Sequence, residues 1–129
     1  MFTDIDDATR AHIDRDLAEA AVAGINGSIS DIVASFEETL GEYLALDPDL
    51  QRAYPRGDTA RIFGTALGDA FIREHGFQWQ MLNDDYGTDL VVASPSRDMY
   101  TAPLVVVDTR FEDDETGKLT AFIAQFLGE

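Results

Sequence analysis

The 129-residue sequence contains no cysteine and only one lysine, Lys118. The absence of cysteine excludes disulfide bonds, thiolate zinc sites, iron–sulfur clusters and cysteine nucleophiles. No uninterrupted apolar run approaches the roughly 18 residues that a membrane-spanning helix needs. The segment Met1–Asp7 carries acids where a secretory signal has a basic region. We therefore expect a cytoplasmic protein that makes no contact with a membrane.

Positive charge is scarce. Nine Lys and Arg residues stand against 25 Asp and Glu residues, which gives a formal net charge of -16 at pH 7. Such a surface repels phosphate backbones and anionic lipid headgroups, so nucleic acid is not expected as a partner. Hydrophobic residues make up 45% of the chain, too many for a disordered protein. The acidity indicates either a solvated shell, from genome composition or salt adaptation, or a surface that binds a basic protein.

Motifs of the common catalytic classes are missing. The sequence has no G-x-S-x-G elbow, no Walker loop, no dinucleotide fingerprint after a strand and no H-E-x-x-H. His12 and Asp16 lie four residues apart on one helix face, a spacing that two metal ligands can use. Without cysteine or a paired histidine, the spacing favours a solvated His12 over a metal site. The sequence indicates no cofactor and favours a protein without enzymatic activity, although it does not exclude an enzyme.

Apolar residues recur at helical spacing up to Gly76. Asp58 is a good N-cap for a helix that Gly76 ends, and the Pro following Asp47 ends the helix before it. The expected elements are helices over 4–23, 29–44 and 58–75, with an irregular connection over 47–57. Residues 4–57 are therefore predicted to form a helical hairpin and a connection.

After Gly76 the apolar residues alternate with polar ones, which is typical of strands with one buried face. The expected elements are strands over 77–81, 90–93 and 104–107, turns over 83–87 and 95–98, and a helix over 113–127. We expect a single α+β domain over residues 1–129: two or three N-terminal helices, a three-stranded antiparallel meander and a C-terminal helix packed on the sheet. Its second part, the helix, antiparallel sheet and helix, covers residues 58–129.

Two groups of residues stand out as candidates. Gly64 and Gly68 lie one helical turn apart and leave a flat groove, which favours tight packing on another helix over a ligand or dimer groove. Trp79 and Tyr86 lie near acids in the predicted sheet and its turn, where they form either core or the lining of a pocket.

Several short runs resemble a bacterial family called domain of unknown function 3806. They are Gly64–Phe71, Glu74–Trp79, Asp84–Leu90 and Pro103–Val106, which match a glycine-bearing helix, an entry into a strand, an acidic Tyr-Gly turn and a Pro-Leu strand start. The resemblance covers 62–127. It implies an α+β fold in an uncharacterised bacterial protein and carries over no activity or catalytic residue.

Three functions remain open. The first is a non-enzymatic, cytoplasmic interaction domain that binds a basic protein partner, in its sharper form an inhibitor or immunity-type protein that neutralises a basic toxin or nuclease. The second is a small-molecule binding protein or a hydrolase with paired carboxylates in a pocket between the sheet and the helices. The third is a homodimer through the face with the two glycines. The candidate binding residues are Gly64, Gly68, Trp79, Asp84, Asp85 and Tyr86, with no catalytic residue, metal or cofactor assigned.

Overall fold

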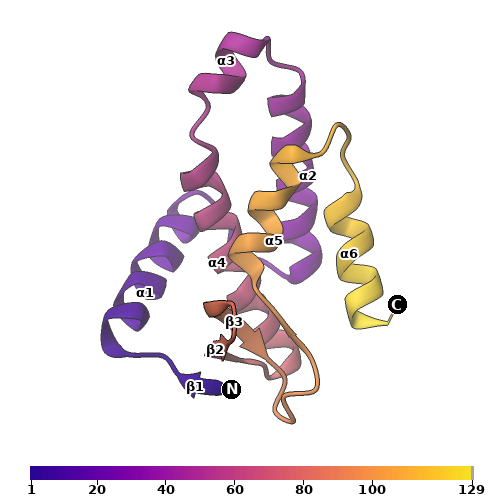
Figure 1. The fold of residues 1–129 in the computed structure, drawn as a ribbon. Coiled ribbons are helices and arrows are strands. Elements are labelled where there is room, and N and C mark those ends of the chain that lie inside the picture. Colours follow the sequence, from indigo (N-terminus) through magenta and orange to yellow (C-terminus); the bar gives the residue numbers. More distant parts are fainter. Residues whose placement is uncertain (129) are drawn as a thin grey trace.

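The chain forms an α+β fold over residues 1–128, the residues that the computed structural model describes (Figure 1). The elements are β1 (Phe2–Asp4), α1 (Asp7–Val22), α2 (Ile29–Leu44), α3 (Pro48–Ala53), α4 (Arg56–His75), β2 (Gln78–Asp84), β3 (Gly87–Ala93), β4 (Tyr100–Thr101), α5 (Pro103–Thr109), the 3-10 helix η1 (Arg110–Glu112) and α6 (Lys118–Leu127). The predicted α+β class is confirmed. The detail differs, because four helices within residues 1–128 precede β2 and the sheet has four strands.

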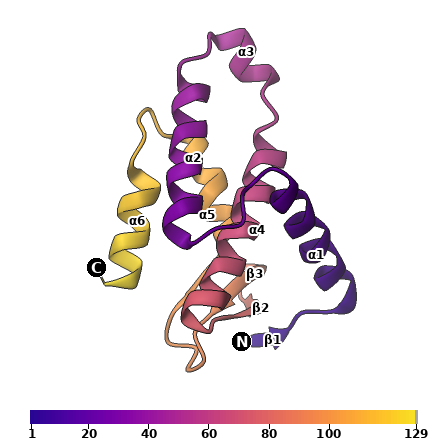
Figure 2. The same ribbon diagram turned by 180° about the vertical axis from the view of Figure 1, so that it is seen from behind.

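Helix α4 lies at the centre of the fold. Two views half a turn apart place α1 on one side of α4 and α2 with α6 on the other (Figures 1 and 2). A Cβ atom at Gly64 would lie 2.6 Å from Cα of Leu104 in α5, and one at Gly68 would collide with the indole ring of Trp79. Tight packing within the chain, which the sequence favours over an open groove, is confirmed.

The sheet has the order β1-β2-β3-β4, with every neighbouring pair antiparallel. β2 and β3 form the expected hairpin, which closes in a two-residue turn at Asp85–Tyr86. Gly87 follows at φ of +130°, a conformation that favours glycine. Sequence alternation does not reveal β1, because three residues are too few to show a period of two. β1 forms by pairing Phe2 with Leu82, far along the chain.

The predicted third strand over 104–107 is wrong, because these residues lie in α5. Pro103 occupies the first turn of α5, where its missing N–H is not needed. Pro103, Val107 and Phe111 are buried at four-residue intervals while Val105 is 57% exposed, so burial follows a helical period. Packing against α4 therefore overrides the β propensity of the valines, and β4 takes the place beside β3.

The predicted packing of the C-terminal helix on the sheet is also wrong, because α6 packs against α2. Helix α6 begins at Lys118, so the acids at 113–115 precede the helix instead of occupying its first turn. Glu37 of α2 accepts a hydrogen bond from the Thr120 hydroxyl at 2.8 Å and from the Thr120 backbone N–H at 3.4 Å. A side chain of α2 thus satisfies an amide at the start of α6, which has no local side-chain cap.

Helices α1, α2 and α3 each begin after a residue whose side chain caps the helix. Asp6 and Ser28 cap α1 and α2 by accepting backbone N–H bonds. Asp47 caps α3, a short helix within the connection expected over 47–57. Asp58 lies in the first turn of α4 and is not its cap, which corrects that expectation. Gly76 ends α4 in the left-handed conformation, as predicted.

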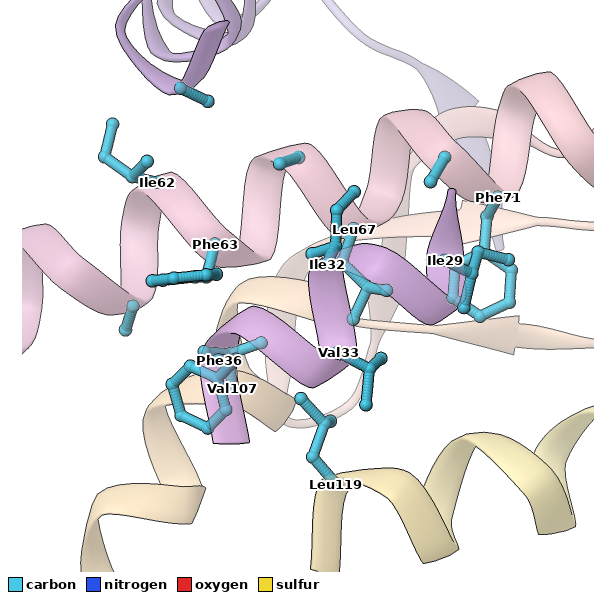
Figure 3. Close-up of a cluster of buried hydrophobic side chains, with 14 of the residues drawn as sticks. Ile29, Ile32, Val33, Phe36, Ile62, Phe63, Leu67, Phe71, Val107 and Leu119 are labelled. Atoms are coloured by element: carbon cyan, nitrogen blue, oxygen red, sulfur yellow. The ribbon is translucent and has the colours of Figure 1, made fainter. Parts of the chain in front are cut away.

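The hydrophobic core lies mainly between α2, α4, α5 and α6 (Figure 3). Phe36 of α2 lies edge-on to Phe63 of α4, with 5.4 Å between ring centroids, and to Phe111 of η1 at 5.6 Å. Such pairs contribute about 0.5–1.5 kcal/mol beyond the burial of their area. Helix α1 adds Ile13 and Ala20 to this core, and Leu17 packs against it.

Candidate functional site

The tip of the β2–β3 hairpin carries three of the six candidate residues. We call Asp84, Asp85 and Tyr86 the hairpin tip. Tyr86 is 99% exposed, and its backbone N–H donates to Oδ1 of Asp84 at 2.9 Å. Both aspartates are exposed. Behind the tip, the Thr88 hydroxyl donates to Oδ1 of Asn83 at 2.8 Å, which links the two strands across the base of the turn.

Trp79 lies apart from the hairpin tip. It is 3% exposed and faces Gly68 of α4, so its place in the core is confirmed. Asp84 lies five positions after Trp79 in β2, which places their Cα atoms roughly 16 Å apart. The structure therefore does not bring Trp79 together with the carboxylates of the tip. The indole N–H of Trp79 has no hydrogen-bond partner, and it is enclosed on all sides.

Gly64 and Gly68 are buried beneath α5 and Trp79. Their face of α4 is filled from within the chain and offers no groove to a ligand. The same packing closes this face to a second copy of the chain. The two glycines thus serve the close approach of α5 and β2 to α4.

A cleft of about 550 Å³ opens between α1 and α4, above the sheet. We call it the α1–α4 cleft. Helix α1 supplies most of its polar lining, and β3 and α5 supply apolar side chains. The lining residues are Thr9, His12, Ile13, Arg15, Asp16, Glu19, Arg61, Thr65, Leu90 and Leu104.

Arg61 of α4 organises the polar wall of this cleft. Its guanidinium forms an ion pair with Asp16, which is buried, and lies 3.6 Å from Oε2 of Glu19 and 3.4 Å from Oδ1 of Asp58. Burial acts to lower the pKa of Arg61, but the charge of Asp16 and the hydrogen bond to Asp58 outweigh it and raise the pKa above its ordinary value. Arg61 therefore stays protonated and ties α1 to α4.

His12 and Asp16 both line the cleft, but they do not form a metal site there. Within residues 1–128, no three His, Cys, Asp or Glu side chains gather closely enough to hold a metal ion. The Nδ1 atom of His12 contacts the guanidinium of Arg15. The Nδ1 nitrogen of His12 thus faces the Arg15 side chain.

The sequence alone does not show that Arg61, Glu19 and Thr65 line one cleft. Glu19 lies away from the apolar positions of its predicted helix, and Arg61 is one of several charged residues in the helix predicted over 58–75. The one local signal is Asp58, three residues before Arg61, which indicates an ion pair on one helix face. The link from Arg61 to α1 needs the tertiary structure.

Comparisons with known proteins give one match. A search of curated proteins and a search of solved structures found no match. A family model described as Domain of unknown function (DUF3806) matches residues 50–122, more than half of the chain. The match spans α4, the β2–β3 hairpin and α5, and it leaves out α1, which supplies most of the cleft lining. No helix within residues 1–128 is both long and apolar enough to cross a membrane. The chain thus belongs to the DUF3806 family, with the matched part running from α3 into α6.

Proposed function

We propose that the protein is a non-enzymatic interaction module that binds a basic protein partner through the hairpin tip. The observation that carries the proposal is Tyr86, 99% exposed directly after two exposed aspartates at the turn of a hairpin. Tyrosine is enriched among the residues that dominate interface energies, because its ring buries a large area at little cost in conformational entropy. A fully exposed ring at a hairpin turn is well placed to enter a pocket of a partner.

The charge distribution supports a basic partner. Asp89 adds an exposed carboxylate to those of Asp84 and Asp85 within the same hairpin. The net charge of -16 draws a basic protein from a distance and speeds its association, and this effect weakens as salt rises. The same charge disfavours nucleic acid and anionic membranes as partners.

The sharper form of the proposal is an inhibitor or immunity-type protein that neutralises a basic toxin or nuclease. A cytoplasmic setting, where disulfide bonds are rare, fits the absence of cysteine. Because α5 and Trp79 cover Gly64 and Gly68, a homodimer would have to use another surface.

The test is a pull-down with the tagged protein from a cytoplasmic extract of the source cells at low and high salt. We expect one stoichiometric basic protein at low salt and less of it at high salt. With that partner purified, Tyr86→Ala is expected to lower the affinity at least tenfold, because an interface hot spot is worth about 2 kcal/mol or more.

Two double variants distinguish a local contact at the hairpin tip from the long-range effect of the net charge. Asp84→Asn with Asp85→Asn removes two charges from the hairpin tip, and Glu38→Gln with Glu42→Gln removes two from the exposed face of α2. The proposal expects a larger loss of affinity from the first pair. Equal losses, or capture that does not depend on salt, would contradict binding through the tip.

Small-molecule binding is the second candidate function, and the α1–α4 cleft favours it. The cleft lies between the sheet and the helices, but its carboxylates belong to Asp16 and Glu19 instead of Asp84 and Asp85. Hydrolysis would require one of them to transfer a proton. The ion pair of Asp16 with Arg61 supports binding over hydrolysis. Turnover of ester or amide substrates that is lost in Glu19→Gln would support the hydrolase form.

A further inference from the structure

One edge of β3 (Gly87–Ala93) lacks a neighbouring strand along most of its length. Strand β4 pairs only with Val92 and Ala93. Beyond β4 the chain leaves the sheet, because α5 begins at Pro103 and packs on α4. Within residues 1–128, no strand therefore lies beside residues 87–91 on this side.

The register of the hairpin decides which main-chain groups face this open edge. The two-residue turn makes Asp84 and Gly87 a hydrogen-bonded pair, so every second residue from Gly87 onwards bonds to β2. The residues between them, Thr88 and Leu90, point their N–H and C=O groups away from β2. Ser94 continues the alternation, because its N–H bonds to the chain just before β4.

These outward groups are available to another strand. We call residues 88–90 the open β3 edge. Thr88 is exposed and Leu90 is half-buried, and no other main-chain group within residues 1–128 bonds to either of them. A row of unpaired donors and acceptors at the edge of a sheet is a template for strand addition.

The side chains along the open β3 edge alternate in character. Leu90 lies on the helix side of the sheet, where it lines the α1–α4 cleft together with Leu104 of α5. Open space thus adjoins Leu90 on that side. Asp89 points to the opposite face, because successive side chains of a strand alternate, and it is exposed. An added strand would therefore meet an apolar side chain on one face and a carboxylate on the other.

The charge of the chain selects the partner of this edge. Asp84, Asp85 and Asp89 are exposed acids of one hairpin, and the net charge of the chain is -16. A second copy of the chain carries the same charge and is repelled. A segment of a basic protein is attracted, and its basic side chains can lie beside Asp89. Charge complementarity thus favours a basic segment over a second copy.

We propose that the open β3 edge binds an extended segment of a basic protein as an added antiparallel strand. The apolar residues of the segment lie opposite Thr88 and Leu90, on the side of the cleft, and its basic residues lie opposite Asp89. The inference rests on the proposed function, because it describes how a basic partner that contacts the hairpin tip continues along the same hairpin.

The experiment titrates the full chain with four peptides whose ends are capped. The first alternates lysine and valine over six residues, and the second has glutamate in place of each lysine. The third and fourth are the lysine peptide with N-methyl groups on its valines or on its lysines. In the proposed register the valine amides face β3 and the lysine amides face solvent, so only the third peptide loses its pairing donors.

Amide NMR signals of Thr88 and Leu90 report binding at the edge. We expect the lysine peptide to bind at least tenfold more tightly than the glutamate peptide and the valine-methylated peptide. The lysine-methylated peptide should bind within a factor of about three of the lysine peptide. The methyl groups are on the peptide, so the fold of the protein is the same in every titration.

A nuclear Overhauser effect identifies the register. Asp89 and a peptide lysine form a non-hydrogen-bonded pair in the proposed strand, which brings their Hα atoms close together. We expect a cross-peak between these two Hα atoms. Bound peptide without this cross-peak would overturn the antiparallel pairing.

Asp89→Asn tests the charge beside the added strand. It is expected to weaken binding of the lysine peptide about threefold, the size of an exposed ion pair. Asp114→Asn is the matched control, because it changes the net charge equally at an exposed position between η1 and α6. Equal effects of the two variants would show that only the net charge acts and would overturn the contact with Asp89.

The other outcomes separate strand addition from the proposed function. Equal affinities of the two methylated peptides, or shifts confined to Tyr86, would overturn strand addition and leave a basic partner at the hairpin tip. The absence of shifts at Thr88 and Leu90 with the lysine peptide at millimolar concentration would also overturn strand addition. A glutamate peptide that binds as tightly as the lysine peptide would contradict the basic partner itself. Dimerisation of the free chain that protects the Thr88 and Leu90 amides would make a second copy the occupant and overturn the proposal.

Discussion

Glu74, near the end of α4, accepts a hydrogen bond from the backbone N–H of Ile29, the first residue of α2, at 2.6 Å. The next residue towards the start of α4, Arg73, donates to the carbonyl oxygen of Gly27 at 2.8 Å. The end of α4 therefore holds the start of α2 through two side chains. Glu37 of α2 holds the start of α6 in the same way. Glutamates from other helices thus satisfy amides at the starts of two helices.

Replacing Glu74 with alanine is expected to destabilise the protein by about 1 kcal/mol, the usual effect of losing a cap. The Ile29 amide then loses its acceptor at a partly buried position. Urea and thermal unfolding measure the loss, which corresponds to about 4 °C in Tm. Glu38→Ala, an exposed position on α2, is the control and should have little effect. A loss from Glu38→Ala as large as that from Glu74→Ala would contradict the capping role.

Replacing Glu37 with alanine should loosen α6 more than the rest of the chain. The bonds from Thr120 to Glu37 join α6 to α2, and α6 has no side-chain cap of its own. Amide hydrogen exchange is expected to speed up in 118–121 and to stay unchanged in α4. A uniform increase over both helices would show that Glu37 acts on global stability instead.

Replacing Gly64 with alanine is expected to cost about 1–3 kcal/mol, the range for overpacking a core. The new Cβ would lie 2.6 Å from the Cα of Leu104, so the backbone of α5 has to move. Gly57→Ala is the matched control within the same helix, because open space surrounds Gly57. It should stabilise the protein by up to about 1 kcal/mol through helix propensity. Urea unfolding distinguishes the loss of stability expected for Gly64→Ala from the gain expected for Gly57→Ala. Equal changes in the free energy of unfolding would contradict the close approach of α5 to Gly64.

The N-cap of α1 makes stability depend on pH. The backbone N–H of Thr9 donates to Oδ1 of Asp6 at 2.7 Å and holds the pKa of Asp6 below its ordinary value. A lowered pKa in the folded state means that the stabilisation is present above the unfolded pKa and is lost as pH falls through the folded pKa. The pH range over which this stabilisation is lost therefore lies below about pH 4.

Asp6→Asn keeps a neutral capping side chain and removes this titration. Wild type and variant are compared by urea unfolding from pH 6 down to pH 2.5. The difference in free energy of unfolding between the wild type and Asp6→Asn should shrink as pH falls below about 4. Asp14→Asn, an exposed position of α1, is the control and should show a smaller change over this window. A difference between wild type and Asp6→Asn that stays constant with pH would contradict the role of the Asp6 charge.

Local patterns in the sequence predict the parts of the fold that depend on neighbouring residues. Helix α2 follows from its apolar stripe and from Ser28, which bonds to an amide three residues away. The end of α4 follows from Gly76, and the β2–β3 hairpin follows from alternation and an acidic turn. The position of Asp84, Asp85 and Tyr86 in a turn is predicted for the same reason. All these features rest on interactions that span a few residues.

Only the tertiary structure decides the elements that rest on distant partners. The valines before Val107 become helical because α5 packs on Gly64, and β1 exists because Phe2 meets Leu82. The docking of α6 depends on a hydrogen bond between residues 83 positions apart. The α1–α4 cleft depends on an ion pair between Arg61 and Asp16, 45 positions apart.

The sequence by itself determined the charge of the chain, its lack of thiol chemistry and its α+β class, because these depend on residue types and local periodicity. The tertiary structure decided which charges are buried in ion pairs and which are exposed to solvent. Folding pairs Asp16 with Arg61 and leaves Glu19 and the hairpin tip exposed to solvent. Ion pairs form over a few ångströms in space, and a sequence does not specify that distance for residues on different elements.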